Sequence, residues 1–150
     1  MTRAAASVYA IREGRPEDGL ALEAFDHQFI GTHAAELFEE AIAGGKLTVA
    51  EAEGGDVVGY VRWEHFWDTI PLCLTVRVHP DHRRRGLGRA LYQHVDNVLR
   101  REGHAFWLSS TEETNETSIR FHEALGFRRI GALVELGQDV PEVFYRKDLR

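Results

Sequence analysis

A chain of 150 residues, of which 43% are hydrophobic, is long enough to bury one core, so we expect a single domain over residues 1–150. Its net charge of −6 argues against a nucleic-acid-binding surface, and no run approaches the roughly 20 apolar residues of a membrane-spanning helix. Residues 1–7 lack the apolar segment of a signal peptide, so we expect a cytoplasmic protein. A single cysteine, Cys73, excludes an internal disulfide and a metal site built from several cysteines.

The first part of the chain predicts a strand followed by two helices. Residues 4–12 have strand character, with Val8, Ala10 and Tyr9 as candidate core residues. Apolar residues then recur at helical spacing in two stretches. Thr32 is a candidate N-cap for the second helix, and the Gly44-Gly45 pair ends it. The two apolar stripes consist of Leu20, Leu22, Phe25, Phe29 and Ile30, and of Leu37, Phe38, Ala41 and Ile42.

The rest of the chain alternates strands and helices. The predicted elements are a hairpin of strands 46–53 and 57–67, a strand at 72–78, a helix at 86–103, a strand at 104–109, a helix at 115–125, and strands at 127–136 and 143–149. Strands 72–78 and 104–109 flank a helix, so we expect them to be parallel neighbours joined by a right-handed crossover. The order predicts an α/β fold with a mixed sheet and helices on both faces.

The segment from Leu72 to Arg89 carries the clearest functional signal. An apolar strand meets the turn Pro80-Asp81, three arginines and two glycines follow, and an amphipathic helix begins. A helix start attracts anions through its backbone N–H groups and dipole, glycines let a phosphate approach the backbone, and arginines add forked donors. The segment has a local charge of +4 from one acidic residue and five arginines, namely Arg77, Arg83, Arg84, Arg85 and Arg89. This pattern predicts a site for a large phosphorylated cofactor.

Two motifs in this order resemble the GNAT superfamily of N-acetyltransferases. The family pattern Arg/Gln-x-x-Gly-x-Gly/Ala is matched by residues 83–88, and Val78-His79-Pro80 matches the wider form ahead of it. The second family pattern places an asparagine at the start of a late helix that ends in Gly-Phe, which residues 115–127 match. The element order agrees over essentially the whole chain. The resemblance implies a mostly antiparallel sheet of about six to seven strands, flanked by about four helices in the order β-α-α-β-β-β-α-β-α-β-β.

The resemblance also implies a cofactor and a reaction. Acetyl-CoA, or a related acyl-CoA, would donate its acyl group directly to a primary amine in a ternary complex. The backbone of residues 83–89 would hold the pyrophosphate, and the strand edge at Val76 and Val78 would pair with the pantetheine arm, because that strand splays from strand 104–109. The implied cofactor-binding residues are Val76, Arg77, Val78, Arg83, Arg84, Arg85, Gly86, Leu87, Gly88, Arg89, Asn115, Ser118 and Phe121.

Other interpretations of these residues stay open at this point. Asn115 is also a good N-cap, Phe121 is also a core residue, and the arginines could form a solvated turn. His79 and His82 are three residues apart, but the neighbouring arginines repel a cation, so no metal is expected. The resemblance further implies a small-molecule or peptide amine acceptor and is compatible with a homodimer. From the charge and the lack of a long apolar run, we expect no nucleic-acid or membrane partner.

Glu64 is the first candidate for the catalytic base. The attacking amine must be neutral, whereas a lysine-type amine has a pKa of about 10.4, so a base assists the reaction. Glu64 lies in the aromatic segment 63–68 on the third strand, where charge and cation–π contacts would hold an ammonium group. Asp68 and His65 are weaker candidates. The alternative is a solvent-facing carboxylate that alternates with core aromatics.

His122 is the candidate general acid. Many relatives carry a tyrosine at this position, and an imidazole can donate a proton near neutral pH. The acid role could instead fall to Tyr145 or to water, and His122 could be a helix residue with no chemical role. A backbone N–H near Val78 would stabilise the negative charge on the thioester oxygen.

Two other functions were weighed. Residues 121–127 also look like a helix signature of vicinal-oxygen-chelate metalloenzymes, but only 23 residues follow Phe127, too few for a second βαβββ unit. A non-catalytic acyl-CoA-binding or regulatory module on the same fold is the remaining alternative.

The acceptor itself is not specified by the sequence, because a polyamine, an amino acid, an aminoglycoside-like drug or a protein N-terminus would each fit. The acidic residues Glu36, Glu39 and Glu40 would line its entrance or form a solvated helix face.

Overall fold

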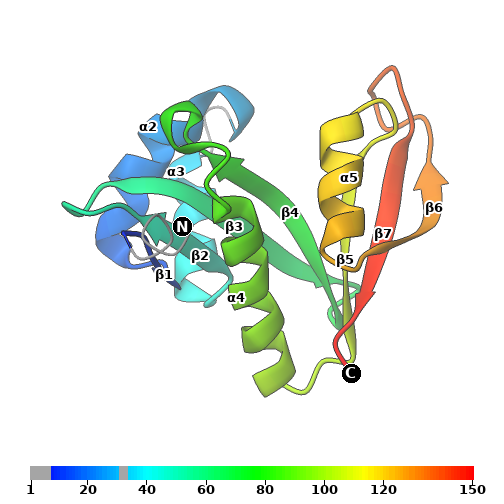
Figure 1. Ribbon diagram of the computed structural model, residues 1–150, viewed down its shortest axis with the longest axis horizontal. Helices are drawn as coiled ribbons and strands as arrows, with labels where there is room; N and C mark the ends of the chain where they lie inside the picture. Colours follow the sequence, from blue (N-terminus) through cyan, green and yellow to red (C-terminus); the bar gives the residue numbers. More distant parts are fainter. Residues whose placement is uncertain (1–7, 31–33) are drawn as a thin grey trace. The chain divides into compact units, whose positions relative to one another are not determined.

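The computed structural model describes the backbone of residues 8–30 and 34–150. It describes the side chains of the same residues except those of 26–30 and 34. The predicted strand residues 4–7 and the predicted N-cap Thr32 lie outside this description, as do the side chains of Phe29 and Ile30. The elements, labelled in Figure 1, are β1 (Ala10–Glu13), η1 (Pro16–Asp18), α2 (Gly19–Ile30), α3 (Ala34–Ala43), β2 (Leu47–Glu51), β3 (Val57–Phe66), β4 (Ile70–Val78), η3 (Pro80–His82), α4 (Leu87–Arg101), β5 (Phe106–Glu112), α5 (Glu116–Ala124), β6 (Arg128–Leu133) and β7 (Glu142–Asp148).

The strands form one mixed sheet in the order β1-β2-β3-β4-β5-β7-β6. The predicted order of elements is confirmed, and so is the mostly antiparallel sheet of seven strands with four α-helices among the described residues. The chain groups into two compact units, which comprise residues 1–63 with 75–97 and residues 64–74 with 98–150. The single domain over residues 1–150 stays a prediction. In the described part of the chain, no helix is long and apolar enough to cross a membrane.

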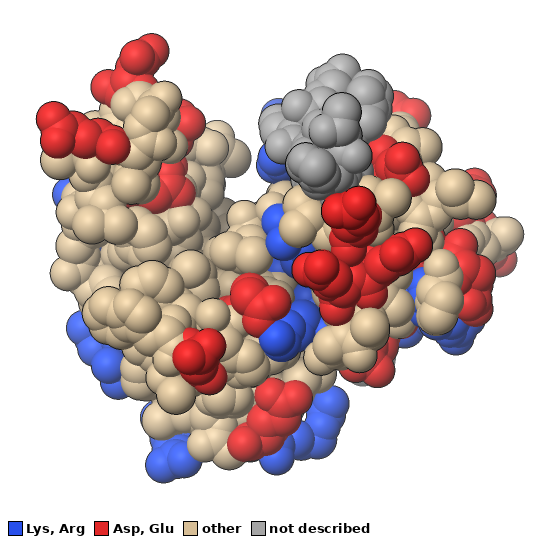
Figure 2. All heavy atoms as spheres, turned by 180° about the vertical axis from the view of Figure 1, so that it is seen from behind, with Lys and Arg blue, Asp and Glu red and all other residues tan. Residues whose placement is uncertain are grey.

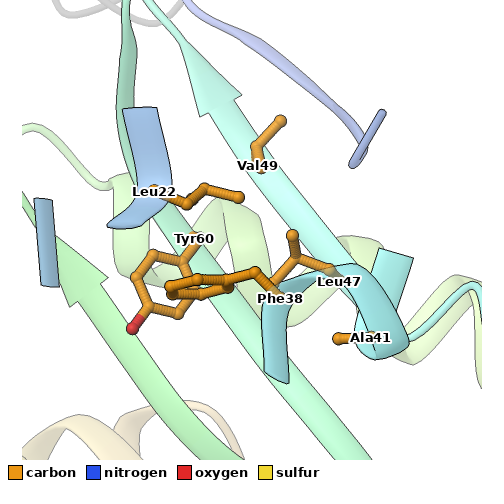
Figure 3. Close-up of a cluster of buried hydrophobic side chains, with 6 residues drawn as sticks. All are labelled: Leu22, Phe38, Ala41, Leu47, Val49 and Tyr60. Atoms are coloured by element: carbon orange, nitrogen blue, oxygen red, sulfur yellow. The ribbon is translucent and has the colours of Figure 1, made fainter. Parts of the chain in front are cut away.

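The core of the first unit lies between helices α2 and α3 and the antiparallel strands β2 and β3. Strand alternation directs Leu47 and Val49 of β2 to the same face, where Tyr60 of β3 meets Phe38 of α3 edge to face, with ring centroids 5.3 Å apart. Figure 3 shows the buried cluster, which consists of Leu22, Phe38, Ala41, Leu47, Val49 and Tyr60. Leu22, Phe38 and Ala41 of the predicted helical stripes therefore cover this face. The predicted stripe position of Leu20, at the start of α2, is wrong, because its side chain is 83% exposed.

Helix α4 covers the opposite face of these strands. Thr48 of β2 forms a hydrogen bond with His94 of α4, Oγ1 to Nδ1, at 3.2 Å. At Gly59 of β3 a side chain would not fit, because a Cβ there would lie 3.0 Å from Arg77 O and 3.5 Å from Leu91 Cδ1. The missing side chain thus lets β3 approach β4 and α4 closely, and both faces of the sheet in this unit carry helices, as predicted.

The predicted core position of Val8 and Ala10 is wrong. Val8 is 40% exposed, and Ala10 is exposed as well. The regular strand begins only at Ala10, and β1 forms the edge of the sheet, so it has a neighbouring strand on one side alone. Strand β1 is instead held by ion pairs, because the Arg12 guanidinium contacts Asp18 at 2.8 Å and Glu51 at 2.6 Å.

In the second unit, helix α5 covers one face of strands β5, β7 and β6. Strands β5 and β7 pair antiparallel along their whole length, from Phe106↔Asp148 to Glu112↔Glu142, and β6 pairs with the other edge of β7. Leu72 of β4 pairs parallel with Leu108 of β5, which confirms the predicted parallel neighbours. Trp107, which precedes Leu108 on β5 and so faces the other side of the sheet, is fully buried.

Candidate functional site

The predicted phosphate site is a tight bend between β4 and α4 in the first unit. After η3 the backbone turns at Arg84 and Gly86, whose φ angles are +63° and +77°. Gly86 O accepts a hydrogen bond from Ala90 N at 3.0 Å, which closes the first turn of α4. The N–H groups of Leu87 and Gly88 belong to this turn, where helix geometry provides no intrahelical acceptor. The bend therefore suits an anion, since the helix dipole adds partial positive charge at the same point.

The space beside this bend is open and its rim is basic. A Cβ at Gly86 would have no heavy atom within 4 Å. Arg83 Nε donates to Val78 O at 3.3 Å, and Arg85 Nη1 donates to the Tyr9 hydroxyl at 3.1 Å. Arg83, Arg84, Arg85 and Arg89 are all exposed, so their charge faces the solvent around the bend. Elsewhere, Figure 2 shows acidic and basic side chains dispersed over the visible face.

Tyr9, a candidate core residue in the sequence, is half-buried and contacts the bend, which sequence analysis did not predict. Its hydroxyl lies 2.8 Å from His82 Nδ1, and the two rings meet edge to face with centroids 5.8 Å apart. Together with the contact to Arg85, this ties the residue before β1 to the bend. The two partners are 73 residues apart in the chain. No local spacing in the sequence signals such a contact.

Three predicted cofactor residues line a pocket at the end of β4. The pocket has a volume of about 390 Å³ and is lined by Ala24, Phe25, Arg77, Val78, His79, Pro80 and Arg83. His79 N donates to Val58 O at 2.8 Å, which holds the end of β4 against β3. Val76 and Val78 are half-buried, and their predicted pairing with a pantetheine arm stays a prediction.

The two histidines of the bend are engaged in local contacts. His79 Nδ1 accepts a hydrogen bond from Asp81 N at 3.1 Å, and His82 Nδ1 contacts Tyr9. Among the described residues, no group of three or more histidine, cysteine, aspartate or glutamate side chains is placed to hold a metal ion.

The late helix motif forms a capped helix start in the second unit. Asn115 is the N-cap of α5, and its Oδ1 accepts a hydrogen bond from Ser118 N at 3.1 Å. This satisfies one N–H of the first turn, so the structural interpretation of Asn115 is confirmed, while its contact with a cofactor stays a prediction. Phe121 is half-buried, with its ring centroid 5.7 Å from that of His122.

His122 is 2% exposed and is held on three sides. Its Nδ1 lies 2.7 Å from Ser118 O, so this nitrogen carries the proton and donates it to the carbonyl. Its Nε2 lies 2.7 Å from Ser109 Oγ on β5 and accepts from that hydroxyl in the neutral tautomer. The ring also stacks on Tyr145, with centroids 4.9 Å apart. These contacts give His122 a positioning role between α5 and the sheet, and its action as general acid stays a prediction.

Burial lowers the pKa of His122, against a smaller opposing effect of the hydrogen bond to Ser118. An unfolded histidine takes up its proton near a pH of about 6.5, and the folded protein does so only at lower pH. His122 therefore contributes stability above about pH 6.5 that is lost as the pH falls through the folded pKa.

We expect the thermal unfolding midpoint of the parent to fall between pH 7 and pH 5 more steeply than that of His122→Gln. The variant loses the hydrogen bonds of the imidazole, so its midpoint is lower at pH 7, but it has no buried imidazole to protonate. His65→Gln is the control, because it removes a half-buried histidine of the same unit and should leave the slope of the parent unchanged. Parallel curves for the parent and His122→Gln would contradict the assignment.

Glu64 lies near the end of β3, in the second unit. Its side chain is 52% exposed, and its Oε1 accepts a hydrogen bond from His65 N at 2.9 Å. His65 Nδ1 lies 3.9 Å from the same carboxylate oxygen. The exposed carboxylate is accessible to a cationic ligand, and its role as a base stays a prediction. Glu36, Glu39 and Glu40 lie on the exposed side of α3, as a solvated helix face requires.

The comparisons with known proteins agree with these motifs. A sequence model of the acetyltransferase (GNAT) family matches residues 10–127. The L-amino acid N-acyltransferase MnaT of Escherichia coli is 29% identical over 106 residues, which cover 67% of this chain and 60% of that protein. An L-methionine sulfoximine/L-methionine sulfone acetyltransferase of Salmonella typhimurium is 34% identical over 98 residues, or 62% of this chain and 57% of that protein. The matched part of this chain thus spans at most 60% of the length of these two relatives.

Solved structures extend the agreement to the fold. The structure of an acetyltransferase from Salmonella typhimurium with its cofactor acetyl-CoA superposes with a TM-score of 0.76 at 25% sequence identity, and the match covers 95% of each chain. The seven-stranded sheet with its four described α-helices therefore has the architecture of solved acetyltransferase structures.

Proposed function

Because this chain belongs to the acetyltransferase (GNAT) family, we propose that it transfers an acetyl group from acetyl-CoA to the primary amine of a small acceptor in a ternary complex. The observation that carries this proposal is the bend at Arg84 and Gly86, with its two positive φ angles ahead of α4. A bend of this kind, with open space at Gly86, suits a pyrophosphate on the backbone N–H groups of a helix start. Membership of the family supports an N-acyltransferase, and the activity, the acetyl donor and the amine acceptor are together the proposal.

We assign the donor site to residues on both motifs. The backbone of residues 83–89 would bind the pyrophosphate, with the exposed arginines adding charge. Val76, Arg77 and Val78 would bind the pantetheine arm, and Asn115, Ser118 and Phe121 would contact it near the thioester. When bound, acetyl-CoA supplies an acyl carbon activated by its thioester.

The proposed chemistry follows from the pKa values of the reacting groups. Glu64 would take a proton from the acceptor ammonium, since only the neutral amine is a nucleophile. The nitrogen then attacks the thioester carbon and the C–N bond forms, and a backbone N–H near Val78 would stabilise the negative charge that develops on the oxygen. As the C–S bond breaks and the amide forms, the nitrogen gives up its second proton to water. The departing thiolate takes up a proton, from His122 or from water. Because thiols have a pKa of about 8.5, an acid at this step accelerates the reaction only modestly.

The acceptor class rests on the two relatives, which act on L-amino acids and on methionine derivatives according to their names. We therefore propose the α-amino group of a small amino acid as the acceptor. The amine of a free amino acid is more basic than a peptide α-amino group, whose pKa is about 8, because a carboxylate replaces the electron-withdrawing amide. Most of the acceptor is therefore protonated near physiological pH, and a base assists the transfer.

The test combines binding with turnover. We expect calorimetry to give a micromolar dissociation constant for acetyl-CoA, and free thiol to be released only when an L-amino acid is added. The chain's own Cys73 is 6% exposed, so a thiol reagent should report the released CoA with a low background. Absence of acyl-CoA binding would overturn the family function, and binding without turnover of any amine would overturn the transfer reaction.

A further inference from the structure

The second unit contains a pocket that the proposed reaction has not used. It has a volume of about 440 Å³, and every residue that lines it is hydrophobic or a glycine. We call it the apolar pocket and define it by Phe66, Trp67, Leu72, Leu108, Leu133 and Phe144. Pockets that bind small ligands have volumes of about 300–1,000 Å³ and mostly apolar walls. The apolar pocket therefore has the size and character of a site for a small apolar group.

The turn at the rim of the pocket is held in an unfavourable conformation. Trp67 and Asp68, between β3 and β4, have φ angles of +51° and +61°, and Thr69 N donates to Phe66 O at 3.3 Å. Asparagine, aspartate and glycine are the usual residues at the central positions of such a turn, so Trp67 is the unusual one. A non-glycine residue in this region costs about 1–3 kcal/mol, and strain of this kind collects at ligand-binding sites.

The strained residue is also exposed. Trp67 is 76% accessible, and its ring stacks on Phe66 with centroids 4.5 Å apart. A large aromatic ring that is kept in solvent beside an apolar pocket leaves apolar surface that a ligand can cover.

The carboxylate of Glu64 lies on the same face of β3 as the ring of Phe66. Residues 64 and 66 are two apart on β3, so their side chains project to the same side of the sheet. Glu64 is 52% exposed and Phe66 belongs to the apolar pocket. A ligand that complements both carries a cationic amine at one end and an apolar group at the other.

We propose that the apolar pocket binds the apolar side chain of the acceptor, with the acceptor's ammonium group directed to Glu64. This inference rests on the proposed function and specifies its substrate class, namely L-amino acids with an aliphatic, thioether or aromatic side chain. The pocket offers no polar side chain to satisfy a hydroxyl or a charge, so polar amino acids pay a desolvation cost there.

The first test compares acceptors whose amines are alike. L-Leucine, L-methionine and L-phenylalanine are measured against glycine and L-serine, with a polyamine included for breadth. Each buried methylene contributes about 0.8 kcal/mol, so three to four of them predict a kcat/KM for leucine about 50-fold or more above that for glycine. Equal values for leucine and glycine would overturn the pocket assignment and leave the transfer reaction intact. Turnover of no amine in the panel would overturn the proposed function itself.

The second test removes the aromatic rim. In Trp67→Gly, we expect kcat/KM to fall at least about tenfold for leucine, mainly through KM, and to stay unchanged for glycine. Glycine suits the positive φ of this position, so the variant should fold at least as well as the parent. The control is Leu20→Ala, which shortens another exposed apolar side chain, 83% accessible. Alanine is used there because Leu20 lies in a helix, which glycine would destabilise.

Fluorescence gives a readout that does not depend on turnover. Trp63 and Trp107 are 3% and 0% exposed, so Trp67 is the tryptophan whose emission a ligand should change. With CoA present, leucine should shift the emission to shorter wavelength and glycine should not, and Trp67→Phe should abolish the shift. Sedimentation tests whether a second copy of the chain occupies the pocket instead. If Trp67→Gly converts a dimer into a monomer and lowers kcat/KM equally for leucine and glycine, the pocket is a contact between two copies and the proposal is overturned.

Discussion

Acetyl-CoA binding should weaken at least about 100-fold when Gly86 is replaced by tryptophan, a loss of about 2.7 kcal/mol. The indole would occupy the open space beside the bend, where a Cβ has no heavy atom within 4 Å. The φ of +77° adds strain for any side chain. Because this space is open, the new ring meets no part of the core, so the loss should concern the ligand rather than the fold.

Calorimetry with acetyl-CoA measures this loss, and Gly137→Trp is the matched control. Gly137 has a similar φ of +84° and a Cβ there would also have no heavy atom within 4 Å, but it lies between β6 and β7. The control carries the same backbone strain and the same added ring, and should bind acetyl-CoA like the parent. Equal affinities of Gly86→Trp, Gly137→Trp and the parent for acetyl-CoA would show that the bend is not part of the cofactor site.

Glu64→Gln should lower kcat about 100-fold or more at pH 7, within the range of about 10²–10⁴ that general base catalysis contributes. The amide has nearly the same shape but cannot accept a proton, so acetyl-CoA binding should not change. The defect should shrink as the pH rises toward the pKa of the acceptor amine, which lies above the value of about 8 of a peptide α-amino group, because the amine then loses its proton to water.

Asp68→Asn serves as the control for this variant, since it removes a carboxylate from the same exposed segment. Steady-state rates for both variants between pH 6.5 and pH 9 give the comparison. If Asp68→Asn shows the loss that recovers with pH and Glu64→Gln does not, the base is Asp68.

Much of this architecture follows from local patterns. Apolar residues at helical spacing located α4, and the strand–helix–strand order predicted the parallel pair of Leu72 and Leu108. Glycine and arginine content located the bend before α4, because a positive φ and exposed charge are properties of single residues. These features depend on interactions within one or two turns of chain, which a sequence displays directly.

Features that depend on distant contacts were not predicted. The Tyr9–His82 hydrogen bond joins residues 73 positions apart, and the partner of His122 Nε2 is Ser109 on another element. The turn at Trp67 lacks the Asn-Gly signature of its geometry, so sequence rules assigned this residue to a strand. In β6, Ile130 and Leu133 would be expected in a core, yet they are 47% and 51% exposed, because β6 forms the last strand of the sheet.

The shielded thiol of Cys73 has a practical consequence for spectroscopy. It is the single cysteine of the chain, and its 6% exposure makes it slow to react with maleimides. Cysteines that replace exposed turn residues, such as Gly54 in the first unit and Gly137 in the second, would then take up a pair of dyes while the native Cys73 is kept. Energy transfer between the dyes would report the separation of the two units, with and without acetyl-CoA, in otherwise unaltered protein.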